Sequence, residues 1–369
     1  MGFAARSGWA VLLVSMPLLT WAAEFDNPVI ANDFPDPTFW QDDKGVTYGV
    51  ATGLRTVMRT RDLVHWEDTG VNPVVAADRA ELERFSRHFW APDAVRLGDE
   101  YRIYVTQFVS SRTNRLVCLS SENPAGPFRF RSVVIESWEK KIWDVAIDSE
   151  VRTVDGKVWL FTGSVAGGVW RTRLSDDGLS LDPDAPFEHA AGLVPPSPAG
   201  KWRGWIYSHR CYEGSYLYRR NGWWYLFVSS GSIFEDGVHP GYGLYVGRSR
   251  TLEGDFVDKT GLSMLAGGGT RLLSSVGEFA GAGHNGDVFT DAAGRTYLFF
   301  HSHWKGSKSR SLDLQQLHWD SEGWPYFDGG CVKKRGMSPQ LPVRMDHHGD
   351  ARTVGGRGPF ANANGGTAL

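Results

Sequence analysis

The sequence has few cysteines and little net charge. Its three cysteines, Cys118, Cys211 and Cys331, allow at most one internal disulfide, and none lies in a Cys-x-x-Cys pair or near histidines with zinc-site spacing. We expect all three to be packing residues. The formal charge of -3 at pH 7 argues against the basic surface that a nucleic-acid partner requires.

Long apolar runs are missing beyond the first 23 residues. A run from Trp9 to Leu19 follows an arginine, and the small residues Ala22 and Ala23 come after it. This order is typical of a secretory signal peptide, and the run is short for a membrane span. We predict that residues 1–23 are cleaved and that the mature protein is secreted or periplasmic, without membrane association. The alternative is an uncleaved N-terminal anchor.

No long amphipathic helical pattern occurs, whereas 16 Trp, 12 Tyr and 44 Gly suit an all-β protein with tight turns. A turn glycine followed by aromatic and β-branched residues recurs five times. These glycines are Gly45, Gly98, Gly156, Gly222 and Gly294, with gaps of 53, 58, 66 and 72 residues. Each gap fits four strands and their loops, which is one blade of a β-propeller. We therefore predict a five-bladed β-propeller over residues 24–344.

The end of the chain differs in composition from the repeats. Residues 345–369 are rich in glycine, asparagine and arginine and lack apolar periodicity, which predicts a disordered tail. No composition shift marks a second domain, and we expect a monomer.

A polar or acidic residue precedes each of the five glycines at a recurring distance. They are Asp36, Asp148, Glu213 and Asn285, eight or nine positions before the glycine, and Asp93, five positions before it. His284 stands beside Asn285. The first strand of each propeller blade lines the central channel, so equivalent positions converge on the axis. We expect these side chains to share one site, because surface loops have no reason to repeat an acid at this offset.

Five short motifs surround these residues. In chain order they are Asp33-Phe34-Pro35-Asp36-Pro37, Trp90-Ala91-Pro92-Asp93, Ala146-Ile147-Asp148, Glu213-Gly214 and Gly283-His284-Asn285. Their order resembles that of glycoside hydrolase family 43, and the resemblance runs from about Asn27 to Phe327. Residues 257–285 and 317–325 look most like the arabinan-degrading, endo-1,5-α-L-arabinanase-like members.

The resemblance implies a five-bladed propeller that cleaves glycosidic bonds with inversion. It implies that Asp36 is the general base, that Glu213 is the general acid and that Asp148 tunes and orients the acid. His284 would lie near the axis, where many members hold a calcium ion through water; no organic cofactor is expected. The substrate would be a plant cell-wall polysaccharide or oligosaccharide of the arabinan or arabinoxylan type.

The residues themselves agree with this assignment and leave alternatives. Inversion needs two carboxyl groups far enough apart to admit a water, and carboxylates from non-adjacent blades can give that separation. Asp33 competes with Asp36 as base and Asp144 competes with Asp148, although motif and repeat offset favour the second of each pair. His284 is alternatively a buried structural histidine.

Three residues are predicted to bind the substrate. Trp90 either stacks on a sugar ring or belongs to the core. Asp93 either lies near the pocket or caps a turn. Arg310 is expected to reach sugar hydroxyls.

The predicted function is hydrolysis of α-L-arabinofuranosidic bonds, most simply those of α-1,5-arabinan. One alternative is an exo-acting α-L-arabinofuranosidase or β-xylosidase of the same family. A retaining, fructan-cleaving propeller enzyme is a second, but the Trp-Met-Asn-Asp-Pro-Asn signature of that group is absent. The third is a non-catalytic propeller that binds sugar or protein, which a Glu213→Ala variant would leave unaffected.

Overall fold

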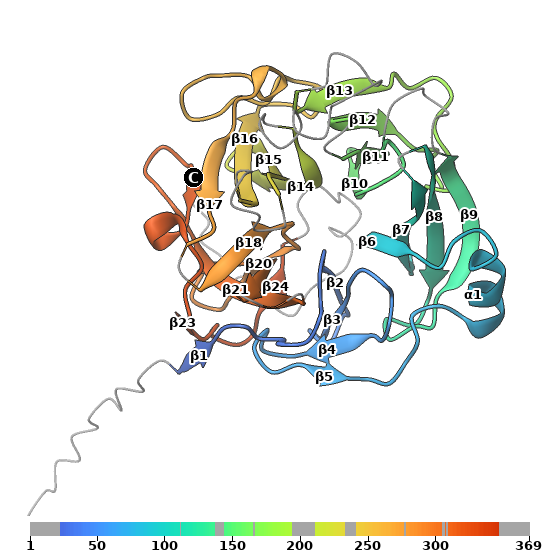
Figure 1. Ribbon diagram of the computed structural model, residues 1–369, viewed down its shortest axis with the longest axis horizontal. Coiled ribbons are helices and arrows are strands. Elements are labelled where there is room, and N and C mark those ends of the chain that lie inside the picture. Colours follow the sequence, from blue (N-terminus) through green and yellow to red (C-terminus); the bar gives the residue numbers. More distant parts are fainter. Residues whose placement is uncertain are drawn as a thin grey trace, which may run out of the picture.

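The computed structural model describes residues 23–110, 112–136, 144–164, 167–193, 211–232, 241–276, 278–304, 307 and 309–346. Five antiparallel sheets of consecutive strands surround a central axis (Figure 1). The structure confirms the predicted all-β, five-bladed β-propeller. Among the described residues, none of the helices is long and apolar enough to cross a membrane.

The first four blades have four strands each. Blade 1 contains β2 (Thr38–Gln41), β3 (Thr47–Val50), β4 (Met58–Thr60) and β5 (Glu67–Asp68). Blade 2 contains β6 (Phe89–Leu97), β7 (Glu100–Ser110), β8 (Thr113–Ser121) and β9 (Arg129–Glu136). Blade 3 contains β10 (Glu150–Val154), β11 (Lys157–Thr162), β12 (Val169–Arg173) and β13 (Glu188–Ala191). Blade 4 contains β14 (Glu213–Arg220), β15 (Trp223–Ser230), β16 (Gly243–Ser249) and β17 (Thr270–Leu273).

Blade 5 has an interrupted innermost strand. Both β18 (Phe279–Gly283) and β19 (Val288–Thr290) pair with β20 (Thr296–Trp304), which is followed by β21 (Arg310–Trp319) and β22 (Pro325–Tyr326). Near the chain ends, β1 (Glu24–Asp26) pairs with β23 (Arg335–Met337) and β24 (Arg344–Met345) pairs with β19. The short helix α1 (Ala76–Leu82) connects blades 1 and 2, and two 3-10 turns occupy Met264–Ala266 and Asp328–Gly330.

The predicted repeat is the hairpin between the first two paired strands of each blade. All five of its glycines have positive φ, between 63° and 77°. A left-handed backbone suits glycine, which explains why this residue type recurs there. The hydrophobic core is likewise repeated, as five clusters that each lie between two neighbouring blades.

Five hydrogen bonds join the innermost strands into a closed ring. In each, a side chain of one blade accepts a bond from a backbone N–H of the next blade. The pairs are Thr38 with Ala94, Asp93 with Val151, Glu150 with Leu217, Tyr216 with Val288 and Asp287 with Phe39, at 2.7–3.0 Å. In the sequence of every blade, the residue whose N–H donates comes directly after the residue whose side chain accepts. The ring therefore repeats with the blades and closes the last blade onto the first.

Arg152 balances the three carboxylates of this ring. Its guanidinium lies 3.0 Å from Glu150, 3.4 Å from Asp287 and 4.0 Å from Asp93, and all four side chains are buried. Burial raises the pKa of Asp93 and Glu150, and it raises the pKa of Asp287 to about 7. The centre of the propeller therefore contains a charged cluster that spans three blades.

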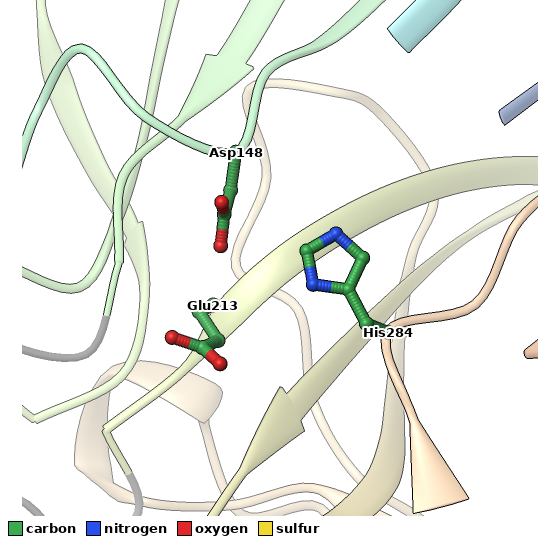
Figure 2. A group of neighbouring side chains, drawn as sticks. All are labelled: Asp148, Glu213 and His284. Carbon is green, nitrogen blue, oxygen red and sulfur yellow. The ribbon is translucent and has the colours of Figure 1, made fainter. Parts of the chain in front are cut away.

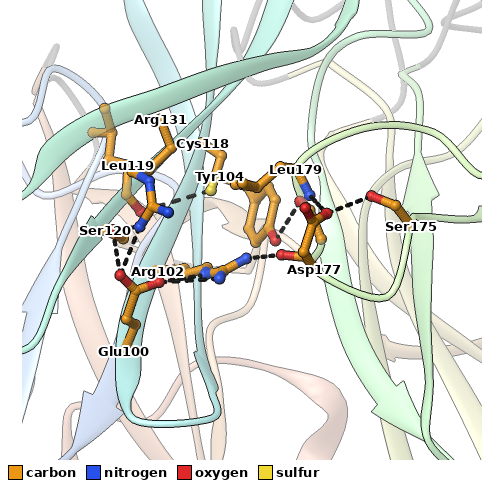
Figure 3. A network of polar contacts seen from close by, with 11 residues as sticks. Glu100, Arg102, Tyr104, Cys118, Leu119, Ser120, Arg131, Ser175, Asp177 and Leu179 are labelled. Atoms are coloured by element: carbon orange, nitrogen blue, oxygen red, sulfur yellow. Dashed lines mark hydrogen bonds and ion pairs between the residues drawn. The ribbon is translucent and has the colours of Figure 1, made fainter.

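Blades 2 and 3 also meet through a polar network (Figure 3). Arg102 pairs with Glu100 at 3.0 Å and donates to the backbone oxygen of Asp177, while the buried Tyr104 hydroxyl donates to the oxygen of Gly178 at 2.9 Å. A Cβ at Gly178 would lie 2.6 Å from that hydroxyl. The turn of blade 3 can therefore approach blade 2 only with glycine at this position.

The cysteines are free, and none forms a disulfide. Cys118 and Cys211 are buried, and burial raises the pKa of Cys118 to about 11 and that of Cys211 to about 12. Cys331 is half-buried. The packing role predicted for the cysteines fits the two buried ones.

The chain ends differ in part from the prediction. Most of the predicted signal peptide and tail lie outside the described residues. However, Met345 pairs with Phe289 in β24 and packs in the core between blades 1 and 5, and Asp346 accepts a hydrogen bond from Tyr218 at 3.2 Å. Residues 345 and 346, which we assigned to the tail, therefore belong to the propeller.

Candidate active site

A backbone bend of positive φ precedes or interrupts the innermost strand of every blade. The bend residues are Asp36 (51°), Ala91 (41°), Asp148 (53°), Gly214 (58°) and His284 (43°). Positive φ is uncommon for residues with a side chain, and such backbone strain concentrates at functional sites. Each bend lies two or three residues before the accepting residue of the hydrogen-bonded ring. The hydrogen-bonded ring thus fixes the register of the innermost strands directly after the bends.

Four of the five bend residues, and Glu213 beside the fifth, line one pocket of about 380 Å³. Its wall consists of Asp36, Thr52, Trp90, Ala91, Ile147, Asp148, Ser164, Glu213, His284 and Arg310. Residues from all five blades therefore meet there. Six of the seven predicted site residues are among them, and Asp93 is the exception.

Asp36 lies at the centre of a set of positive and polar partners. Arg310 contacts its Oδ1 at 2.7 Å, His284 and His301 approach the same oxygen at 3.4 and 3.2 Å, and the Thr52 hydroxyl donates to Oδ2 at 2.7 Å. Burial raises the pKa of Asp36, but Arg310 and then His284 outweigh this effect and hold it well below its ordinary value. Asp36 is therefore ionised at neutral pH.

Glu213 begins β14 and has a donor on each carboxylate oxygen. Tyr242 donates to Oε1 at 2.6 Å, and Ser164 donates to Oε2 at 2.8 Å. The two hydroxyls come from different blades, since Ser164 follows β11 and Tyr242 precedes β16. The Glu213 side chain is therefore held in one orientation.

Asp148 lies close to Glu213 and His284 (Figure 2). One ligand atom from each of these three side chains lies within 4.8 Å of the other two. Burial, together with the charges of Glu213 and Asp36, raises the pKa of Asp148 well above its ordinary value, although the Gly214 N–H donates to it at 3.2 Å. Asp148 therefore retains a proton beside Glu213 at a pH where an exposed aspartate has lost it.

The same three side chains are the only group of at least three possible metal ligands among the described residues. Calcium prefers six to eight oxygen ligands. Here the two carboxylates already accept hydrogen bonds from the protein, and the third donor is an imidazole nitrogen. This set does not fit a directly bound calcium ion. A hydrated ion beside His284 remains a prediction.

The predicted substrate-binding residues lie in different surroundings. Trp90 is 36% exposed, lines the pocket and stacks on Phe108 with ring centroids 3.9 Å apart, so its other face is available to a sugar. Arg310 lines the pocket but is engaged with Asp36. Asp93 is buried in the ring with its Oδ2 bonded to the Val151 N–H. The structure therefore does not bring Asp93 to the pocket.

The structure separates the competing acids. Asp33 pairs with Arg55 at 3.3 Å and accepts a bond from the Arg310 N–H at 3.1 Å, outside the pocket wall. Asp144 is buried and does not line the pocket. Asp36 rather than Asp33, and Asp148 rather than Asp144, therefore face the pocket.

Four residues of the site carry no sequence motif. Thr52, Ser164, Tyr242 and His301 contact the predicted carboxylates. They come from second strands, from the loops that follow them, or from the residue before a third strand. The signal that could have found Thr52 and Ser164 is positional, since each lies two residues beyond the second strand of its blade.

Known proteins resemble this chain along most of its length. The sequence model of glycosyl hydrolases family 43 matches residues 25–325. An extracellular exo-α-(1→5)-L-arabinofuranosidase of Cellvibrio japonicus is 30% identical over 316 residues, which cover 80% of this chain and 86% of the relative. The extracellular endo-α-(1→5)-L-arabinanase 1 of Bacillus subtilis is 27% identical over 303 residues, covering 79% and 87%.

A solved structure has the same fold. It is an α-L-arabinanase of Cellvibrio cellulosa complexed with arabinohexaose, at 28% identity and a TM-score of 0.69. The alignment covers 80% of this chain and 96% of that one.

Proposed function

The chain belongs to glycosyl hydrolases family 43 and is a glycosidase, and we propose that it hydrolyses the α-L-arabinofuranosidic bonds of α-1,5-arabinan with inversion. One observation carries the proposal: a single pocket holds, on different blades, an ionised carboxylate, Asp36, and the neighbouring carboxyl groups of Asp148 and Glu213, of which Asp148 has a raised pKa. The arabinan-degrading relatives support the choice of substrate.

Asp36 is the general base of this proposal. Its carboxylate accepts a proton from a water while the oxygen of that water attacks the anomeric carbon of the sugar. The lowered pKa keeps Asp36 ionised, and the contacts of Thr52 and Arg310 fix its two oxygens. The base is therefore oriented before substrate arrives.

Glu213 is the general acid. It donates its proton to the glycosidic oxygen as the bond between that oxygen and the anomeric carbon breaks. Asp148, with its raised pKa, keeps a proton in the pocket and adds no charge beside Glu213 while protonated. We propose that Trp90 stacks on the sugar through its exposed face.

Secretion is the second part of the proposal. The apolar run that ends before Ala22 supports it, as do the relatives, which are named extracellular. The N-terminal residue of protein recovered from culture medium tests it: a start near residue 24 supports cleavage, and an intact Met1 contradicts it.

The product profile on linear α-1,5-arabinan tests the function. A ladder of oligosaccharides at early times indicates internal cleavage, whereas monomer or one short product indicates terminal cleavage; both outcomes support the proposed substrate. Relatives of both kinds exist. No cleavage of arabinan, together with release from an aryl xyloside, would contradict the substrate.

A further inference from the structure

Two buried rings connect the two proposed catalytic carboxylates. The Tyr242 hydroxyl donates to Oε1 of Glu213 at 2.6 Å, and Nδ1 of His301 accepts a hydrogen bond from the backbone N–H of Asp36 at 3.2 Å, beside Oδ1 of the same residue. The rings of Tyr242 and His301 are nearly parallel, at 5°, with centroids 5.8 Å apart. This spacing is within the range of offset aromatic stacking. A continuous chain of contacts thus runs from acid to base behind the pocket.

Neither ring is placed to touch the substrate. Tyr242 is 1% exposed and His301 is fully buried, and neither lines the pocket. Tyr242 precedes β16 of blade 4, and His301 belongs to β20 of blade 5. Their stack therefore joins blade 4, which carries Glu213, to blade 5. Blade 5 in turn packs against blade 1, where Asp36 lies.

The pair is held tightly. A Cβ at Gly283 would lie 2.7 Å from the Tyr242 ring, so only glycine lets the end of β18, just before the bend at His284, pack against that ring. Burial, and then the Glu213 charge, raise the pKa of Tyr242 well above its ordinary value, so that its hydroxyl stays a donor. Burial lowers the pKa of His301 to about 3, which keeps the imidazole neutral.

Tyr242 also determines which oxygen of Glu213 faces the substrate. Ser164, the partner of Oε2, lines the pocket, whereas Tyr242, the partner of Oε1, does not. With Oε1 tied to the buried hydroxyl, Oε2 is the oxygen on the pocket side.

We propose that Tyr242 and His301 are paired positioning residues, with Tyr242 orienting the general acid and His301 orienting the general base. The inference rests on the roles proposed above for Glu213 and Asp36. It predicts that the two rings affect different halves of one reaction. If the pair were merely structural, both variants, Tyr242→Phe included, would lose activity alike on a substrate that needs the acid and on one that does not.

The test compares two substrates that differ in their need for an acid. Arabinotriose has a poor leaving group that must be protonated, whereas 2,4-dinitrophenyl α-L-arabinofuranoside has a leaving group that departs unprotonated. Tyr242→Phe keeps the stacked ring and removes the hydroxyl. We expect kcat on arabinotriose to fall about tenfold with KM unchanged, and kcat on the aryl substrate to stay within about twofold.

His301→Phe provides the second signature. It keeps a flat ring beside Tyr242 but removes the nitrogen near Asp36. Because the base is needed whatever the leaving group, we expect kcat to fall by a similar factor on both substrates. Tyr104→Phe is the matched control: its hydroxyl is equally buried but donates to Gly178 between blades 2 and 3 (Figure 3). This control should lower the melting temperature without changing kcat on either substrate.

The outcomes separate this inference from the proposed function. Equal losses on both substrates in Tyr242→Phe, or unchanged kcat on arabinotriose, would overturn the inference. If Glu213→Gln still loses far more activity on arabinotriose than on the aryl substrate, the proposed function stands without it. If the wild-type protein cleaves neither substrate, the proposed function itself fails.

Discussion

Nη1 of Arg310 lies 2.7 Å from Oδ1 of Asp36, although 274 positions separate the two residues in the sequence. Asp36 precedes the first blade and Arg310 begins β21 of the last. The contact exists only when the propeller closes, which the bond from Phe39 to Asp287 in the ring achieves nearby. The closure that stabilises the fold thus also completes the proposed base.

This contact determines the pH range in which the base is ionised. Arg310 is the largest of the influences that lower the pKa of Asp36 against burial, which raises it. In Arg310→Met the pKa of Asp36 should rise, so the acidic limb of the kcat/KM profile should move to higher pH. Arg310→Lys keeps the charge and should shift the limb less. If the acidic limb of the profile stays at the same pH in Arg310→Met, Arg310 does not lower the pKa of Asp36.

Asp36→Asn tests the identity of the base. Loss of a general base lowers kcat by roughly 10²- to 10⁴-fold. We expect this loss on arabinan and on aryl arabinosides alike. Asp33→Asn is the matched control, because Asp33 belongs to the same motif but lies outside the pocket wall. If Asp33→Asn showed the larger loss, the assignment of the base would be reversed.

Gly214→Ala should harm activity more than stability. Gly214 has φ of 58°, and a Cβ there would lie 2.9 Å from Nδ1 of His284, which contacts Asp36. Alanine at positive φ costs about 1 kcal/mol or more. Gly156→Ala introduces the same strain at φ of 77° with open space around the Cβ. We expect similar melting temperatures for both variants and a lower kcat only in Gly214→Ala; equal kcat values would contradict the crowding of His284.

The ring should make folding stability depend on pH. Burial raises the pKa of Asp287 to about 7, above the value of about 3.9 expected in the unfolded chain. A raised pKa contributes stability that is present at low pH and is lost as the pH rises through about 7. Asp287→Asn keeps an oxygen for the Phe39 N–H and removes the titration.

Melting curves between about pH 5 and pH 8 check this linkage. The melting temperature of Asp287→Asn relative to wild type should rise with pH. Asp184→Asn, at an exposed position, is the control, and its melting temperature should change with pH as that of the wild type does. A constant difference between Asp287→Asn and wild type would contradict the raised pKa of Asp287.

Chelation tests the hydrated calcium ion predicted beside His284. If the ion is structural, EDTA should lower the melting temperature of the wild type, and added calcium should restore it. His284→Gln should abolish both effects. A wild-type melting temperature that does not respond to EDTA would exclude a structural calcium ion.

The blades could be predicted because the turn glycines are a local requirement of each hairpin. Glu213 and Asp148 could be placed near one axis because they lie nine and eight positions before those glycines. Asp93 could not be placed in this way. It lies five positions before Gly98, closer than the others, and the ring residues Glu150 and Tyr216 lie six positions before their glycines. Its shorter offset matches the ring rather than the pocket.

The rest of the site depends on tertiary packing. Nothing local distinguishes Tyr242 from the other tyrosines, and His301 lies within a hydrophobic strand. Their contacts with Glu213 and Asp36 arise only after blades 4 and 5 pack together. The bend at Ala91 is equally invisible, because its positive φ comes from the strand register and not from its residue type.

The anomeric configuration of the first product tests the central claim most directly. Proton NMR during hydrolysis of an α-1,5-linked arabino-oligosaccharide, before mutarotation, distinguishes the two anomers of the new reducing end. Inversion with Asp36 as base and Glu213 as acid predicts that the β-anomer appears first. Initial appearance of the α-anomer would mean a covalent intermediate and would contradict the roles assigned to both carboxylates.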